Sequence, residues 1–150
     1  MKEKKIELEI LERIYQNLIM IKEAILRVIK IQNINENLNI FLKDILKIYQ
    51  KLIYSVIGMI KNRNRNKEEE KIGVISKMAT YMSVKINLKK CNNIKDILEM
   101  VKQDILIRNE EINTIIKDYN KITKTILNLC NRINIENVKC IKKLENMKFE

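Results

Sequence analysis

The chain has 150 residues, with 30 Lys and Arg against 19 Asp and Glu and a formal net charge of +11 at pH 7. Apolar residues make up 46% and charged residues 33%, which is typical of a globular protein and excludes an intrinsically disordered one. Pro, His and Trp are absent and Gly occurs twice, so little interrupts helices, and the side chain most used for acid–base catalysis is missing.

Apolar residues recur three and four positions apart through the first 60 residues, a spacing that predicts amphipathic helices. A first helix is expected over residues 5–31. Its inward stripe is Ile10, Ile14, Leu18, Ile21, Ile25 and Val28. The Asn-rich segment 32–37 favours a turn. A second stripe follows: Phe41, Ile45, Ile48, Leu52, Val56 and Met59.

The middle of the chain predicts a shorter helix. Residues 61–67 are all polar, and the three acids Glu68 to Glu70 favour a helix N-terminus directly after them. A weaker stripe then extends to residue 86, and the polar segment 89–93 ends it. Its members are Ile72, Ile75, Ala79, Met82 and Ile86.

Two further stripes predict two long helices in the last third of the chain. The first comprises Ile94, Ile97, Val101, Ile105, Ile112 and Ile115. Residues 118–121 are expected to form a tight corner. The last stripe comprises Ile122, Ile126, Leu129, Ile133, Cys140 and Leu144.

These elements predict an all-α protein, because no segment alternates with the period of a half-buried strand. Residues 1–150 are expected to form one domain, an antiparallel four-helix bundle made of two helical hairpins. The connection over residues 62–93 is long enough to cross the bundle between helices two and three and to carry the short extra helix. That connectivity is ferritin-like. A few apolar residues beside the stripes indicate either a thick core or a homodimer surface: Leu11, Ile19, Leu26, Ile53 and Ile116.

Four residue strings carry a family resemblance: 14–20 (IYQNLIM), 77–88 (KMATYMSVKINL), 97–100 (ILEM) and 136–144, which begins Glu-Asn-Val. The chain resembles the small ferritin-like four-helix-bundle proteins of unassigned function from low-GC Gram-positive bacteria. The resemblance implies Met-Gly pairs in helices one and four, where this chain has Met20-Ile21 and Leu106-Ile107. It also implies carboxylates at positions that here read Lys47-Ile48 and Asn134-Ile135. Ile in place of Gly fills any close helix crossing or small pocket at those positions, and Glu23 remains without the carboxylate companions that the resemblance implies.

No catalytic, cofactor-binding or metal-binding residues are predicted, and we expect the protein not to be an enzyme. A di-iron bundle site uses two Glu-x-x-His motifs, which a chain without His cannot supply. Cys130 and Cys140 are expected in the core. Cys91, beside Lys89 and Lys90, is either an ordinary loop residue or a reactive thiol. The acidic residues fall mainly outside the stripes: Glu7, Glu9, Asp44, Asp96, Glu110 and Glu111.

The densest cationic run is the candidate polyanion contact of the chain. It comprises Lys61, Arg63, Arg65 and Lys67, with Asn between them. Such a run can bind phosphates, but the three acids that follow at 68–70 weaken its positive electrostatic potential. A low-GC genome is a second explanation of the charge, since codons for Lys, Asn and Ile are AT-rich.

Three functions remain open from the sequence. The first is a non-catalytic bundle that associates with itself or with a helical protein partner. The second is a basic bundle that binds nucleic acid or another polyanion, and the third is a degenerate ferritin-like protein that has lost its metal site. A cytoplasmic location is expected. Acids interrupt any N-terminal signal pattern, an odd cysteine count suits a reducing compartment, and the uncharged stretch 52–60 is shorter than the about 20 residues that span a bilayer.

Overall fold

The computed structural model describes residues 2–30, 36–63, 94–119 and 122–147. Four long helices make up almost all of this part of the chain, and it contains no strand: α1 (Lys2–Ile29), α2 (Glu36–Arg63), α4 (Ile94–Asp118) and α5 (Lys124–Asn146). The predicted all-α, four-helix architecture is confirmed. The short helix predicted after residue 68 lies outside the described residues.

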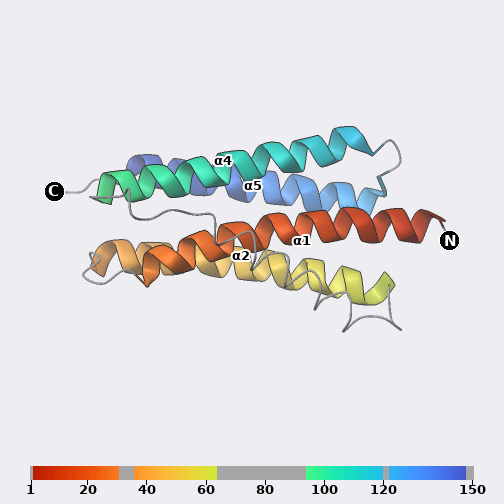
Figure 1. Ribbon diagram of the computed structural model, residues 1–150, viewed down its shortest axis with the longest axis horizontal. Helices are drawn as coiled ribbons and strands as arrows, with labels where there is room; N and C mark the ends of the chain where they lie inside the picture. The colour runs from red at the N-terminus through yellow and green to blue at the C-terminus, as the bar shows by residue number, and fades with distance from the viewer. Residues whose placement is uncertain (1, 31–35, 64–93, 120–121, 148–150) are drawn as a thin grey trace.

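The helices form two antiparallel hairpins, α1 with α2 and α4 with α5 (Figure 1). The hairpins dock with α1 against α4, while α2 and α5 approach each other less extensively. Helices α2 and α4 run in the same direction, so that every pair of packed neighbours is antiparallel. Helix α2 ends where α1 begins, and α4 begins at the opposite end of the bundle.

The boundaries of the last helix differ slightly from the prediction. Helix α4 ends at Asp118, at the expected corner, but α5 begins only at Lys124. Thr123 is its N-cap, and the hydroxyl accepts a hydrogen bond from the backbone N–H of Ile126 at 3.4 Å. Ile122, predicted inside the helix, therefore precedes it and packs half-buried against the core.

The core consists of the aliphatic stripes that the sequence predicted, except on α2, where the buried face is rotated from the predicted one. The six stripe residues of α1, and those of α4 from Ile97 onward, are buried. On α2, however, Phe41, Ile48 and Met59 are only half-buried. The centre of its buried face is instead Leu38, Leu42, Tyr49, Val56 and Ile60, all with no exposed surface. Helix α2 is rotated relative to the prediction because its apolar face is wide enough to contain two neighbouring stripes of residues spaced three and four apart.

The apolar residues beside the stripes belong to a thick core. Leu11, Ile19 and Ile53 are buried, and Leu26 and Ile116 are half-buried against the same cluster. Leu11, Ile19 and Ile53 are therefore not available to a homodimer surface, whereas Leu26 and Ile116 keep part of their surface exposed, and self-association stays a prediction. Among the described residues, no helix is both long and apolar enough to cross a bilayer.

Candidate functional site: a polar layer across the bundle

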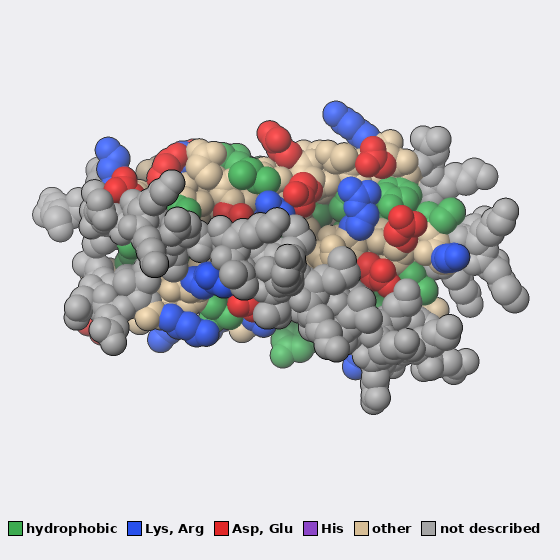
Figure 2. Space-filling view, viewed as in Figure 1, with side chains coloured by type: hydrophobic (Ala, Val, Ile, Leu, Met, Phe, Trp, Pro, Cys, Tyr) green, Lys and Arg blue, Asp and Glu red, His purple; other side chains and the backbone are tan. Residues whose placement is uncertain are grey.

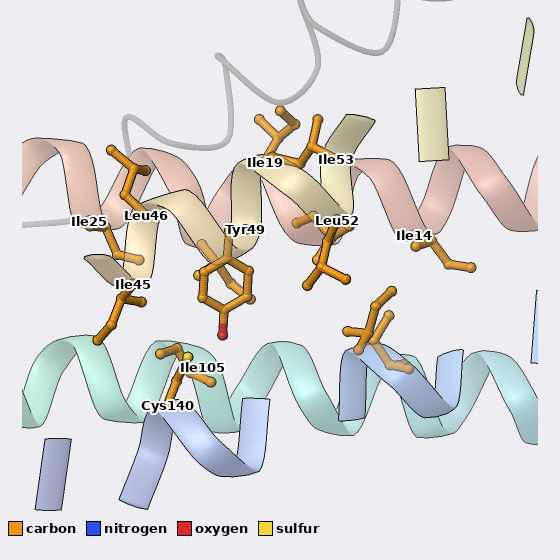
Figure 3. Close-up of a cluster of buried hydrophobic side chains, with 14 of the residues drawn as sticks. Ile14, Ile19, Ile25, Ile45, Leu46, Tyr49, Leu52, Ile53, Ile105 and Cys140 are labelled. Atoms are coloured by element: carbon orange, nitrogen blue, oxygen red, sulfur yellow. The ribbon is translucent and has the colours of Figure 1, made fainter. Parts of the chain in front are cut away.

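A chain of hydrogen bonds crosses the aliphatic core between α2, α5 and α4. The Tyr49 hydroxyl donates to Oδ1 of Asn137 at 2.7 Å, and Nδ2 of Asn137 donates to Oδ1 of Asn109 at 2.9 Å. Tyr49 and Asn137 have no exposed surface. Figure 3 shows Tyr49 pointing from α2 toward Cys140 on α5. Burying these polar groups costs little only because each finds a partner.

Burial keeps the hydroxyl and thiols of this region protonated. It raises the pKa of Tyr49 well above its usual range, with the neighbouring Cys140 adding to the effect. Burial also raises the pKa of Cys140, and it raises that of Cys130 to about 11. Both cysteines are buried, as predicted, and both are unpaired thiols. A protonated thiol is a poor nucleophile and metal ligand, so neither cysteine offers a reactive centre. Cys91 lies outside the described residues.

A second polar group joins α1 to α4. The Asn17 side chain, 2% exposed, donates through Nδ2 to the backbone carbonyl of Arg108 at 2.8 Å and to Oε2 of Glu111 at 3.2 Å. Arg108 lies 3.2 Å from Oε1 of Glu111 through Nη1, and the same Nη1 donates to the sulfur of Met20 at 3.0 Å. Each of the two interfaces between the hairpins therefore contains one buried polar link.

Asp104 is the one described acid whose pKa is clearly raised by burial. Its side chain is 19% exposed, and one oxygen, Oδ2, has no hydrogen-bond partner. The other oxygen lies 3.8 Å from Nε of Arg108, a long ion pair. Burial raises the pKa of Asp104 from 3.8 to about 6, and Arg108 opposes the rise only in part.

The described acids do not converge on a metal-binding arrangement. No group of three or more Cys, Asp or Glu among the described residues could hold an ion. Glu7, assigned by the sequence to the outside of the stripes, is only 17% exposed and lies 2.7 Å from Nε of Arg63. Glu111, also assigned to the outside, faces the α1–α4 interface through its contacts with Asn17 and Arg108.

The candidate polyanion contact is only partly described. Lys61 lies exposed on α2, whereas Arg63 is 18% exposed and its charge is engaged by Glu7. Arg65 and Lys67 lie outside the described residues. Figure 2 shows Lys and Arg interspersed with Asp and Glu on the described surface in view, without a continuous field of one sign. In the described part of this run, the charge of Arg63 is therefore compensated by an acid of α1.

Sequence reasoning missed the residues that form the polar layer. Asn137 left one signal: it falls midway between Ile133 and Cys140, in a seven-residue gap of the predicted stripe. Tyr49 is one of five tyrosines and Asn17 one of 19 asparagines, so composition distinguishes neither residue. No spacing rule distinguishes a buried Asn from a surface Asn when the residue is so abundant.

No family model, curated protein or solved structure matches this chain. The resemblance to ferritin-like proteins therefore stays a prediction that depends on the residue strings alone.

Proposed function

We propose that the protein is a non-catalytic helical bundle that binds an amphipathic helix of a protein partner through the outer face of α5. The observation that carries this proposal is the pair Ile135 and Val138, which are 56% and 43% exposed. Residues three apart on a helix lie on the same face, one turn from each other. A contiguous exposed apolar patch rimmed by polar residues is a feature of binding surfaces, and Ile135 and Val138 form a small patch of this kind.

Charge defines the partner that this α5 patch fits. Three cations, Arg132, Lys139 and Lys142, are exposed around Ile135 and Val138. The one acid of this segment, Glu136, lies 4.0 Å from Lys139, a weak surface pair. A helix with acidic residues beside its apolar stripe complements this surface. A second copy of the chain would bring the same cations together, so the proposal commits to a different, acidic partner.

The test uses a synthetic amphipathic peptide of about five helical turns with Glu beside its Leu stripe. A second peptide has the same stripe with Lys in place of Glu. Fluorescence anisotropy should show binding of the Glu peptide only. The double variant Ile135→Asp/Val138→Asp should weaken that binding by at least about tenfold. The matched control is Ile107→Asp on α4, because Ile107 is 50% exposed but belongs to another helix.

Three results would overturn the proposal. Equal binding of both peptides would remove the charge argument, and an equal loss in Ile107→Asp would remove the assignment to α5. A dimer in sedimentation velocity that the double variant dissociates would identify a second copy as the occupant. Circular dichroism of each variant confirms that the helices remain folded.

We also infer that the bundle is a ferritin-like one without the family's metal chemistry. The parallel course of α2 and α4 supports ferritin-like connectivity, because a long crossover is needed to join them. The core polar positions hold Tyr49, Asn109 and Asn137 rather than the carboxylates and imidazoles that such sites use. Adding ferrous or manganous ions should leave the unfolding temperature unchanged, and a rise that saturates at about one or two ions per chain would refute this inference.

A further inference from the structure

The outer face of α2 presents a row of lysines to solvent. Lys43, Lys47 and Lys51 are exposed, and each lies about one helical turn after the one before. At a rise of about 1.5 Å per residue, the row extends about 12 Å along the helix. None of the three makes an ion pair with another residue that the structure describes. Asp44 is the one acid between residues 37 and 63, so the row keeps a net positive charge.

An exposed aromatic ring continues this row. Tyr54 lies three residues after Lys51 on the same face of α2. Its exposed fraction is 74%, the largest of any large hydrophobic side chain in the described part of the chain. Packing against the core therefore does not explain a tyrosine at this position.

Gly58 leaves the ring of Tyr54 accessible. Helical side chains lean toward the N-terminus of their helix, so a side chain at position 58 would lie over Tyr54, one turn before it. Glycine inside a helix is destabilising relative to alanine. No close approach requires it here, because a Cβ would meet nothing within 4 Å. The packing of the bundle thus gives no reason for Gly58, whereas an accessible Tyr54 ring follows directly from it.

A row of cations beside an accessible aromatic ring is complementary to a single strand of nucleic acid. Lysines bind the phosphates, and an unpaired base stacks on the ring. A duplex keeps its bases stacked on one another and would leave Tyr54 without a partner. A lipid surface needs an exposed apolar helix face, but the apolar face of α2 is buried in the core, and only Ile40 and Tyr54 project beside the lysines.

We propose that the outer face of α2 binds single-stranded nucleic acid, with Lys43, Lys47 and Lys51 on the phosphates and a base stacked on Tyr54. This site precedes the cationic run at residues 61–67 and lies on a different helix from the α5 patch. Three phosphate contacts to a single strand imply that log affinity falls with log salt concentration with a slope of about −2.

The test is fluorescence anisotropy of a labelled oligothymidylate of about 20 nucleotides, measured from about 50 to 200 mM salt. Tyr54→Ser should weaken binding by at least about fivefold and leave the salt slope unchanged, whereas Tyr54→Phe should retain the affinity. Gly58→Leu, which changes no charge, should weaken binding in the same way by covering the ring. A duplex of the same length, and vesicles of phosphatidylcholine with phosphatidylserine, should compete poorly for the site.

A pair of matched triple variants separates the lysine row from net charge. Changing Lys43, Lys47 and Lys51 to Gln should weaken binding by at least about tenfold and flatten the salt slope. The control changes three exposed lysines of α4 and α5 to Gln and should alter the affinity by less than about twofold: Lys117, Lys124 and Lys142. Circular dichroism checks that every variant remains helical.

Four outcomes contradict the proposal. Absence of binding at about 50 mM salt removes it altogether. Equal losses in the two triple variants reduce the effect to net charge, and unchanged binding by Tyr54→Ser removes the stacked base. A duplex or a vesicle that binds as tightly as the oligothymidylate identifies a different polyanion as the ligand.

Discussion

Asp104→Asn is expected to stabilise the protein, because the native carboxylate is largely buried and its Oδ2 atom has no hydrogen-bond partner. Folding raises the pKa of this acid from 3.8 to about 6, so between these values the folded state binds more protons than the unfolded state. Stability contributed by this group therefore falls as pH rises from about 4 to about 6, and the loss persists at neutral pH. A carboxylate held by a close ion pair behaves in the opposite way, because folding lowers its pKa and its contribution to stability is lost as pH falls.

The size of the effect follows from the pKa difference. About two units correspond to about 3 kcal/mol of unfolding free energy, which is an upper limit. An amide at this position carries no charge at any pH, and Arg108 keeps Glu111 as its partner. We therefore expect Asp104→Asn to gain about 2–3 kcal/mol at pH 7 and close to nothing below pH 4. The melting temperature at pH 7 should rise by about 4–12 °C.

Urea unfolding followed by circular dichroism at pH 4 and pH 7 measures the prediction. The quantity compared is the difference between variant and wild type, because the other titrating groups cancel in it. Asp44→Asn, an exposed acid on α2, is the matched control and should change stability by less than about 0.5 kcal/mol. A stability gain that is the same at both pH values, or a loss at pH 7, would show that burial of the Asp104 charge is not the cause.

Three further changes test the packing and the caps. Tyr49→Phe leaves Oδ1 of Asn137 unpaired in the core and should cost about 1–3 kcal/mol in urea unfolding; adding Asn137→Leu should recover part of that cost, and additive losses would contradict the buried link. Thr123→Ala removes the cap bond to Ile126 and should cost about 1 kcal/mol, with restoration by Thr123→Ser as the check. Gly58→Ala on α2 should gain about 0.5–1 kcal/mol, because a Cβ there meets nothing within 4 Å; a loss would mean that this surface is covered.

The helices could be predicted because the residues that each helix buries are apolar and recur every three or four positions in the sequence. The rotation of α2 could not, since Phe41, Ile45 and Ile48 continue as regular a line as Leu42, Ile45 and Tyr49. The choice depends on the neighbours of α2, and α5 approaches it less closely than α1 does. Phe41 and Ile48 accordingly lie at the edge of the core and Tyr49 at its centre.

The α5 patch was beyond the sequence for a different reason. Ile135 and Val138 are as apolar as the buried Ile133 and Ile141, and only the docking of α5 leaves them exposed. The docking of α5 leaves no periodic trace in the chain.

The polar layer explains how seams built mainly from isoleucine and leucine settle on one register. Aliphatic stripes that repeat each turn can slide against each other with little change in buried area. A slide of α4 along α1 would leave the Asn17 amide unpaired, and a slide of α5 along α2 would do the same to Tyr49 and Asn137. Each orphaned group costs about 1–3 kcal/mol, a large share of the stability of a domain this size. One such link spans each interface between the hairpins. The few polar core residues therefore favour a single register of the two hairpins, whereas the apolar residues alone would allow several registers of similar energy.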